Sequence, residues 1–380
     1  MGMVCRVESP LSRSLATTIE RCYMPYIHSV SCALPPHYYD QETLIQGLLK
    51  HWAKRYFNPE RIAAFHRHVL VGGRHLALPI EAYEQLDGLQ ARNDAWLEVS
   101  LDLAEQAVSG VLAQAGLPVH DVRLLASSTV TGIAVPSLEA RLMNRLPCAR
   151  DTKRMPLFGL GCVAGVAGIN RVADYLQGHP QEAAIFLSVE LCSLTLQRDD
   201  LSIPNLISSG LFGDGGAAVL LLGDDHPLVS EAPLELVTWQ SVFFPQTERV
   251  MGWDMVDTGF KVVLSPEVPD IVRRELPGAV QGVCQAAGIH HADLSFVAAH
   301  PGGPKVLQAM EQALDMAHGT LRLSWESLAR YGNMSSVSVL FVLEHMLKDL
   351  PKPDALGLMI AMGPAFCAEL ALLRCCGSRP

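Results

Sequence analysis

The stretch Ala115-Gly-Leu-Pro-Val-His-Asp-Val-Arg-Leu-Leu-Ala-Ser returns later in the chain as Ala287-Gly-Ile-His-His-Ala-Asp-Leu-Ser-Phe-Val-Ala-Ala. In both copies an Asp stands five residues after a Gly and precedes an apolar run. Both copies follow an amphipathic helical pattern, which in the first has apolar residues at steps of three and four: Leu97, Leu101, Ala104, Val108 and Val111. Each Gly therefore predicts a helix end, and each apolar run predicts a buried strand.

A second pair of segments keeps almost the same offset. Cys162-Val-Ala-Gly-Val-Ala-Gly-Ile and Asn333-Met-Ser-Ser-Val-Ser-Val-Leu each open a run of small and apolar residues, and the offsets of the two pairs are 172 and 171. Strand candidates follow at 184–189 and 355–361, and again at 217–222 and 368–373. Any α/β protein repeats such elements, but the matched Gly and Asp positions go beyond periodicity. We expect two halves, 1–228 and 229–380, each with a mixed sheet, whose small-residue helices pack together at the centre.

Composition narrows the class of protein. The chain has 380 residues, 49% of them hydrophobic, which is enough for two cores. Its net charge of −10 argues against a nucleic-acid partner. The ten cysteines are scattered, without a CxxC pair or the spacing of a zinc site, so no metal is expected. With neither a signal peptide nor an apolar stretch of about 18 residues, the sequence predicts a reduced, cytoplasmic protein without a membrane span.

Cys162 stands out among the cysteines. Gly159-Leu160-Gly161 leads directly into the first small-residue helix, so Cys162 lies on a glycine turn at a helix start. Free N–H groups and the helix dipole at such a position are expected to lower the pKa of a thiol. The alternative is a small buried Cys that fills a tight helix contact, and the glycine turn favours a nucleophile.

His300 and Asn333 complete a candidate catalytic set. His300 ends a strand candidate and precedes Pro301-Gly302-Gly303, where α/β proteins often place their sites. Asn333 alone would be read as a helix cap, but the repeat makes it the counterpart of Cys162. A thiolate can attack a thioester and hold its acyl group, while His and Asn donors stabilise an enolate. The three residues thus fit decarboxylative Claisen chemistry without a cofactor.

These segments resemble the motifs of type III polyketide synthases, the chalcone synthase family. The motifs are Gly161-Cys162, Ala299-His300-Pro301-Gly302-Gly303-Pro304 and Tyr331-Gly332-Asn333-Met334-Ser335-Ser336, together with Leu211-Phe212-Gly213-Asp214-Gly215. The resemblance covers nearly the whole chain. It implies a thiolase-like fold with internally duplicated αβαβα layers and mixed five-stranded sheets. It also implies a homodimer that uses acyl-CoA and malonyl-CoA.

The resemblance assigns further residues to the substrate cavity. Phe212 matches an aromatic gatekeeper, and Val262 replaces a second gatekeeper Phe of plant members. The remaining positions proposed for the cavity are Thr131, Cys192, Thr195, Leu196, Ser335, Gly363 and Pro364. Val135-Pro136 matches a segment that reaches the partner subunit's cavity wall. Basic residues in the region that binds CoA in plant members are Arg61, Arg67 and His68.

Small side chains at the gate and wall resemble those of bacterial members that make alkylpyrones and alkylresorcinols. They predict an apolar tunnel for a medium- or long-chain fatty acyl starter, because each buried methylene contributes about 0.8 kcal/mol. The first alternative is a ketoacyl-ACP synthase III, which shares the Cys-His-Asn set and performs one condensation. A thiolase or a papain-like protease fits the motifs less well, and an inactive acyl-binding paralogue is the non-enzyme alternative.

Overall fold

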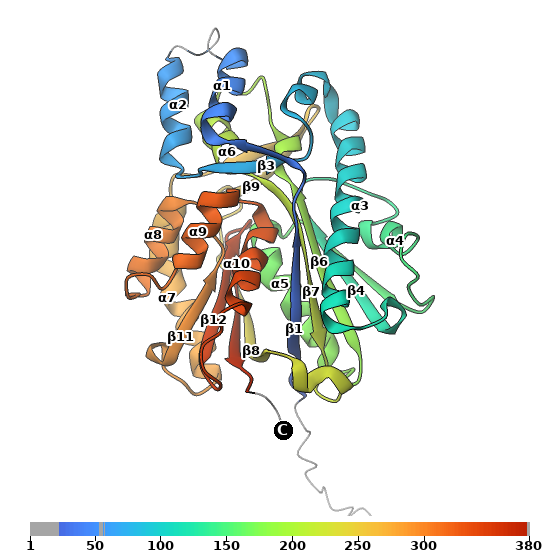
Figure 1. Cartoon of the computed structure of the whole chain (residues 1–380). Coiled ribbons are helices and arrows are strands. Elements are labelled where there is room, and N and C mark those ends of the chain that lie inside the picture. Colours follow the sequence, from blue (N-terminus) through green and yellow to red (C-terminus); the bar gives the residue numbers. More distant parts are fainter. Residues whose placement is uncertain (1–22, 53–55, 57, 378–380) are drawn as a thin grey trace, which may run out of the picture.

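The computed structural model describes residues 23–52, 56 and 58–377 (Figure 1). Most of the strands form one nine-stranded sheet, in the order β11-β12-β13-β8-β1-β7-β6-β4-β5. Its strands are β1 (Tyr26–Ala33), β4 (Val122–Thr129), β5 (Lys153–Phe158), β6 (Ala183–Leu191), β7 (Asp214–Leu222), β8 (Leu234–Phe243), β11 (Leu294–Ala299), β12 (Leu356–Gly363) and β13 (Cys367–Cys375). Two smaller sheets pair β2 (His37–Asp40) with β3 (Gly73–Leu76) and β9 (Met251–Val256) with β10 (Gly259–Leu264).

In this part of the chain the α-helices are α1 (Gln41–Trp52), α2 (Pro59–His68), α3 (Gly88–Ala115), α4 (Leu138–Leu142), α5 (Ala164–Gln177), α6 (Ile203–Leu211), α7 (Val268–Ala286), α8 (Pro304–Ala313), α9 (Arg322–Tyr331) and α10 (Ser338–Leu347). Helix α3 packs on strands of the first half, and α7 packs on β13 and β8 of the second (Figure 1). Helices α5 and α10 lie between the two groups of strands. This layering confirms the αβαβα arrangement. None of the described helices is long and apolar enough to cross a membrane.

The duplication predicted from the sequence is present in the strand pairing. In the first half β4 runs parallel to β6, which pairs antiparallel with β7. In the second half β11 runs parallel to β12, which pairs antiparallel with β13. The predicted strand 294–299 matches β11, and the other four strand candidates lie within β6, β7, β12 and β13, except that β12 starts one residue later than expected.

One detail of the expected sheets differs. The first half contributes five strands, β1-β7-β6-β4-β5, whereas the second contributes four, β11-β12-β13-β8. The two groups join into a single sheet because Tyr26 and Ile27 of β1 pair with Glu235 and Leu234 of β8. The proposed border at 228–229 falls within the short 3₁₀ helix Pro227–Glu231, which precedes β8.

The two central helices approach each other closely because their facing residues are small. A Cβ built on Gly165 of α5 would lie 2.3 Å from the carbonyl oxygen of Ser336, which precedes α10. Ser336 in turn exchanges a hydrogen bond of 2.7 Å with Ser188 of β6. The seam between the halves therefore brings the starts of both helices, and with them Cys162 and Asn333, to one region.

Candidate active site

Cys162 lies in the short 3₁₀ helix Gly161–Val163 that leads into α5. Gly161 has a φ of 58°, a left-handed conformation that favours glycine. A Cβ on Gly161 would lie 2.6 Å from Cγ of Pro364, and a Cβ on Gly363 would lie 2.8 Å from the backbone nitrogen of Val163. The Gly363-Pro364 segment is thus packed directly on the turn that carries the thiol.

The direction of the Cys162 pKa differs from the one expected. Only 7% of the residue is exposed, and burial raises the pKa of the thiol to about 12. The hydroxyl of Ser335, 3.6 Å from the sulfur, acts in the opposite direction, and the nearby carboxyl of Glu190 adds to the increase. The prediction of a lowered pKa was wrong because desolvation outweighs the favourable position at the helix start. The thiol is therefore protonated at neutral pH and needs a base.

His300 can serve as that base. Its backbone N–H donates to the carbonyl of Ile360 at 2.8 Å, which fixes the residue just beyond β11. The side chain is buried, and neither ring nitrogen has a hydrogen-bond partner among the described residues. Burial lowers the pKa of His300 to about 3, so its imidazole is neutral. A neutral ring offers one N–H donor and one acceptor to whatever enters the cavity.

Asn333 is held in one orientation. Its Nδ2 donates to the carbonyl of Gly302 at 3.2 Å, and its Oδ1 accepts from the backbone N–H of Ser335 at 2.8 Å. Its backbone N–H donates to the carbonyl of Leu211 at 2.9 Å, and its carbonyl accepts from Gly213 at 3.0 Å. These bonds place the amide beside the His300 loop and tie it to the segment that carries Phe212.

Cys162, His300 and Asn333 line one cavity of about 50 Å³, which we call the smaller cavity. Ser335 and Pro364 line it as well. The cavity thus combines a protonated thiol, a neutral imidazole and an oriented amide, with no metal-binding cluster among the described residues. This set can form a thioester and stabilise negative charge on an oxygen.

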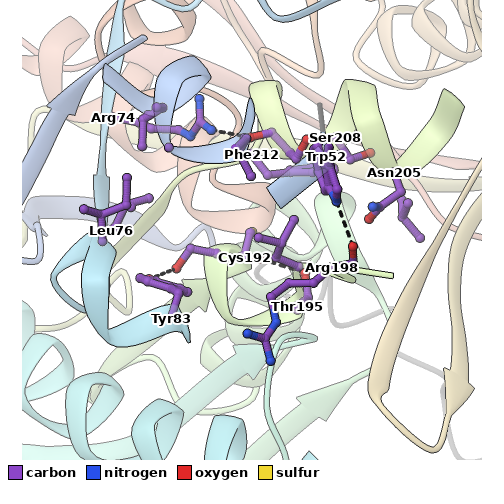
Figure 2. A pocket seen from close by; sticks show the side chains of 18 of the residues that line it. Trp52, Arg74, Leu76, Tyr83, Cys192, Thr195, Arg198, Asn205, Ser208 and Phe212 are labelled. Carbon is purple, nitrogen blue, oxygen red and sulfur yellow. Dashed lines mark hydrogen bonds between the residues drawn. The ribbon is translucent and has the colours of Figure 1, made fainter. Parts of the chain in front are cut away.

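A second cavity, which we call the larger cavity, has a volume of about 100 Å³ (Figure 2). It is lined by the predicted residues Cys192, Thr195 and Leu196, and its wall is mostly apolar. The Oγ1 of Thr195 donates to the carbonyl of Cys192 at 2.7 Å, so this hydroxyl is already engaged. The smaller and larger cavities share three lining residues, namely Phe212, Trp253 and Val262.

Trp253 was missed by the sequence reasoning. It pairs with Val262 across the β9–β10 hairpin, and its ring centroid lies 6.1 Å from that of Phe212. The indole therefore stands beside the small Val262 side chain. The period-two pattern of a hairpin could have found it as the cross-strand neighbour of Val262. Trp52, Arg74 and Tyr83 also line the larger cavity, and no motif marked them (Figure 2).

The basic residues predicted to bind CoA lie on α2, apart from both cavities. The guanidinium of Arg67 makes a double hydrogen bond of 3.0 Å to the carboxylate of Glu42. The guanidinium of Arg61 stacks 5.2 Å from the Phe65 ring centroid, and Nδ1 of His68 contacts the Ala64 carbonyl at 2.6 Å. All three are exposed, so they could meet a ligand only at the protein surface.

Thr131 was predicted to line the substrate cavity, but it lines neither of the two cavities and instead takes part in a buried polar network. Its Oγ1 donates to Oε2 of Glu190 at 2.9 Å, and Ser336 donates to Oε1 of the same carboxyl at 2.6 Å. The backbone N–H of Val130 adds a bond of 3.0 Å. Burial raises the pKa of Glu190 to about 7, although these donors lower it. The network couples β6 of the first half to the Ser335-Ser336 turn of the second.

The fold and this site define a condensing enzyme of the thiolase type. Comparison of the sequence with known proteins identifies the family. Residues 72–240 match the model described as "FAE1/Type III polyketide synthase-like protein", and residues 235–377 match "Chalcone and stilbene synthases, C-terminal domain". The chain therefore belongs to the type III polyketide synthase family, and it is an acyltransferase that performs Claisen condensation. The protease, thiolase and ketoacyl-ACP synthase III alternatives are thereby set aside.

Individual relatives cover nearly the full length of the chain. A 1,3,6,8-tetrahydroxynaphthalene synthase of Streptomyces peucetius subsp. caesius is 45% identical over 92% of each chain. A putative chalcone synthase of Bacillus subtilis is 35% identical over 92% of this chain and 98% of its own. The crystal structure of the Streptomyces coelicolor 1,3,6,8-tetrahydroxynaphthalene synthase superposes with a TM-score of 0.87 at 27% identity, covering 93% of this chain and 99% of that one.

Proposed function

We propose that this synthase loads an apolar, medium- or long-chain acyl-CoA starter on Cys162. It then extends the starter with malonyl-CoA and closes the product to an alkylpyrone or alkylresorcinol. The observation that carries the proposal is the mostly apolar larger cavity, which adjoins the smaller one at Phe212. Its apolar lining includes Leu44, Leu48, Trp52, Leu76, Ile80 and Leu196.

The loading step needs a thiolate, and His300 lines the same cavity as Cys162. The neutral imidazole of His300 takes the proton of the Cys162 thiol, and the thiolate attacks the thioester carbonyl of the starter. A bond forms between the Cys162 sulfur and the acyl carbon, the bond to the CoA sulfur breaks, and CoA leaves as a thiol with the proton held by His300. The low pKa of His300 favours return of this proton, which helps the leaving group.

The extension step uses the two donors. Malonyl-CoA loses its carboxylate as carbon dioxide, and the electron pair passes to the thioester as an enolate. His300 N–H and Asn333 Nδ2 donate to the enolate oxygen. The enolate carbon attacks the acyl group on Cys162, a carbon–carbon bond forms, and the Cys162 sulfur leaves. The next round transfers the lengthened chain back to Cys162.

A second candidate product comes from the relatives. Two Streptomyces proteins similar to this chain, at 45% and 31% identity, are named 1,3,6,8-tetrahydroxynaphthalene synthase. That name favours a polyhydroxylated naphthalene without an alkyl chain as the product. Trp253 stands beside Val262, and both residues line both cavities, where the bulk of the indole is compatible with a small starter.

A ladder of starters from C2 to C18, each with labelled malonyl-CoA and no carrier protein, separates the two candidates. We expect alkylpyrones or resorcinols from C8 to C16 starters and a higher kcat/KM for lauroyl-CoA than for acetyl-CoA. Tetrahydroxynaphthalene from malonyl-CoA alone, with no use of longer starters, would support the second candidate. Cys162→Ala is the control for both.

The size of the larger cavity can be tested at Cys192. Cys192→Phe fills the wall of that cavity, so we expect the longest accepted starter to shorten by several carbons. Cys192→Ser keeps the volume and serves as the matched control. An unchanged chain-length profile in the Phe variant would remove Cys192 from the starter path.

We also propose that the chain acts as a homodimer. Val135, which follows β4, is 90% exposed, and Phe158, the last residue of the edge strand β5, is 60% exposed. Ile133 adds a third exposed apolar side chain there. Such a cluster is typical of a protein interface. Phe158→Asp should shift the mass in sedimentation experiments from dimer to monomer, and a monomeric wild-type protein would contradict the proposal.

A further inference from the structure

Arg74 is a buried cation beside the larger cavity (Figure 2). It lies on β3 and is 3% exposed. Within the described part of the chain no carboxylate forms an ion pair with it; its guanidinium donates to carbonyl oxygens and to one amide instead. Nη1 donates to the Gly210 carbonyl at 2.7 Å and to Oε1 of Gln41 at 2.6 Å, and Nη2 donates to the Ser209 carbonyl.

Gln41 completes the arrangement. Its Nε2 donates to the Gly210 carbonyl at 2.9 Å and to the His66 carbonyl at 2.8 Å. Ser209 and Gly210 belong to the last turn of α6, where carbonyl groups lack helical partners and carry a partial negative charge. A cation there satisfies these carbonyls and is favoured by the helix dipole. Burial lowers the pKa of Arg74 to about 10, and the carboxylate of Asp214 opposes the change, so the side chain stays charged at neutral pH.

The last turn of α6 leads directly to the gate and to the catalytic amide. Phe212 follows α6 and pairs with Asn333 in a parallel bridge. Space at this junction is tight, because a Cβ on Gly332 would lie 2.6 Å from the Leu211 carbonyl and 3.6 Å from Cδ of Arg74. A shift of the α6 end would therefore move both Phe212 and Asn333.

We propose that Arg74 is a positioning residue for the condensation reaction: its forked hydrogen bonds, completed by Gln41, fix the end of α6 and thereby place Phe212 and Asn333. Arg74 acts through these residues and takes no part in the chemistry. Without the fork, the Asn333 amide leaves its position at the enolate oxygen and the gate loses its fixed width. A misplacement of about 1 Å can cost a factor of about 10² in rate.

The inference rests on the proposed use of malonyl-CoA, so the assay is malonyl-CoA decarboxylation by the purified enzyme. For Arg74→Met we expect kcat to fall by about 10- to 100-fold, with KM for malonyl-CoA changed less than about twofold. The range of accepted starters should also widen. Arg74→Lys, a single-point donor, should recover only part of kcat. Added methylguanidinium should restore activity to Arg74→Ala.

Controls separate positioning from other roles. Arg374 is a half-buried arginine on β13 that pairs with Glu235 on β8, and it provides the matched variant: Arg374→Met should leave kcat unchanged. Gln41→Leu keeps the arginine and removes its side-chain partner. It should lower kcat by about 3- to 10-fold, which is less than the loss expected for Arg74→Met. This variant keeps the test informative if Arg74→Met fails to fold.

Two results would overturn the inference. A lower melting temperature with unchanged kcat would make Arg74 a structural residue only. A raised KM with unchanged kcat would make it a substrate contact. If the wild-type enzyme itself did not decarboxylate malonyl-CoA, the proposed function would be contradicted. That outcome differs from the two results above, which concern only Arg74.

Discussion

Cys162 and Asn333 occupy equivalent places in the two halves but are held very differently. Each follows a glycine of positive φ, Gly161 at 58° and Gly332 at 71°. Cys162 lies within a 3₁₀ turn that runs into α5, and Asn333 stands just before the 3₁₀ turn that runs into α10. The Asn333 side chain has two hydrogen bonds, and its backbone has two more. Among the residues that the structure describes, the Cys162 sulfur has one hydrogen-bond partner, the hydroxyl of Ser335 at 3.6 Å.

The difference matches what each residue must do. A donor that keeps one protonation state gains from a fixed orientation, because preorganised donors need no rearrangement as charge develops. A nucleophile must lose a proton, gain an acyl group and release it, so strong hydrogen bonds to its ground state would hinder it. The duplicated backbone thus supports a fixed residue in one half and a changing one in the other.

The sharpest test of this division is Cys162→Ala. Removing the nucleophile should lower polyketide formation by more than about 10³-fold. Decarboxylation of malonyl-CoA should persist, because Asn333 and His300 remain. The measurements are product formation by mass spectrometry and release of labelled carbon dioxide. Loss of both activities would mean that the thiol also takes part in the step assigned to the other half.

The converse variant is Asn333→Ala. Loss of one oriented donor should lower decarboxylation by about 10²- to 10³-fold. Loading of the starter on Cys162 should continue, and intact-protein mass spectrometry would detect the acyl adduct. Asn333→Asp, which keeps the shape but removes the donor, should behave in the same way. Normal decarboxylation in the Asp variant would assign the donor role elsewhere.

The contact between the halves can be broken at Gly165. Its Cβ would lie 2.3 Å from a backbone oxygen, so Gly165→Ala should lower the free energy of unfolding by about 2–3 kcal/mol. Gly178, at the end of the same helix, is the matched control, because its Cβ would meet its nearest neighbour at 3.6 Å. Gly178→Ala should change stability by less than about 0.5 kcal/mol. Equal denaturation midpoints for the two variants would show that the seam can relax.

The repeat, the strands, Cys162 and Asn333 could be predicted because they belong to local patterns repeated at nearly one offset. His300 could be predicted from its place between a strand and a Gly-rich loop. The sequence did not predict features that depend on burial by segments distant along the chain. The pKa direction of Cys162 is set by burial under Gly363-Pro364, about 200 residues away. The family resemblance implied five-stranded sheets, but the second half contributes four strands to the shared sheet.

Other features were not recognised in the sequence. Trp253 lies in a hairpin whose register could not be aligned, although its cross-strand partner Val262 was singled out. Arg74 is an ordinary charged residue in the sequence, and its burial results from α6, β3 and α1 meeting. Of the ten cysteines, Cys5 and Cys22 lie outside the residues that the structure describes.

A pH-dependent effect concerns Glu190, which joins the halves through Ser336 and raises the pKa of Cys162. The pKa of this carboxyl is raised from 4.5 to about 7, so the folded state holds its proton more firmly than the unfolded one. Ionisation therefore costs stability: the free energy of unfolding should fall by up to about 1 kcal/mol per pH unit as pH rises from 4.5 to 7, and level off above 7.

Glu190→Gln should remove this slope. Melting curves at pH 5 and pH 8 should show the wild type losing stability relative to the variant at the higher pH. The matched comparison is Glu182→Gln, since Glu182 lies outside the two cavities and its carboxyl pairs with Lys153. Parallel curves for wild type and Glu190→Gln would mean that the donors from Val130, Thr131 and Ser336 fully compensate the buried charge. In that case the two halves would be joined by an ionised carboxylate at neutral pH, and its negative charge would add to the barrier for forming the Cys162 thiolate.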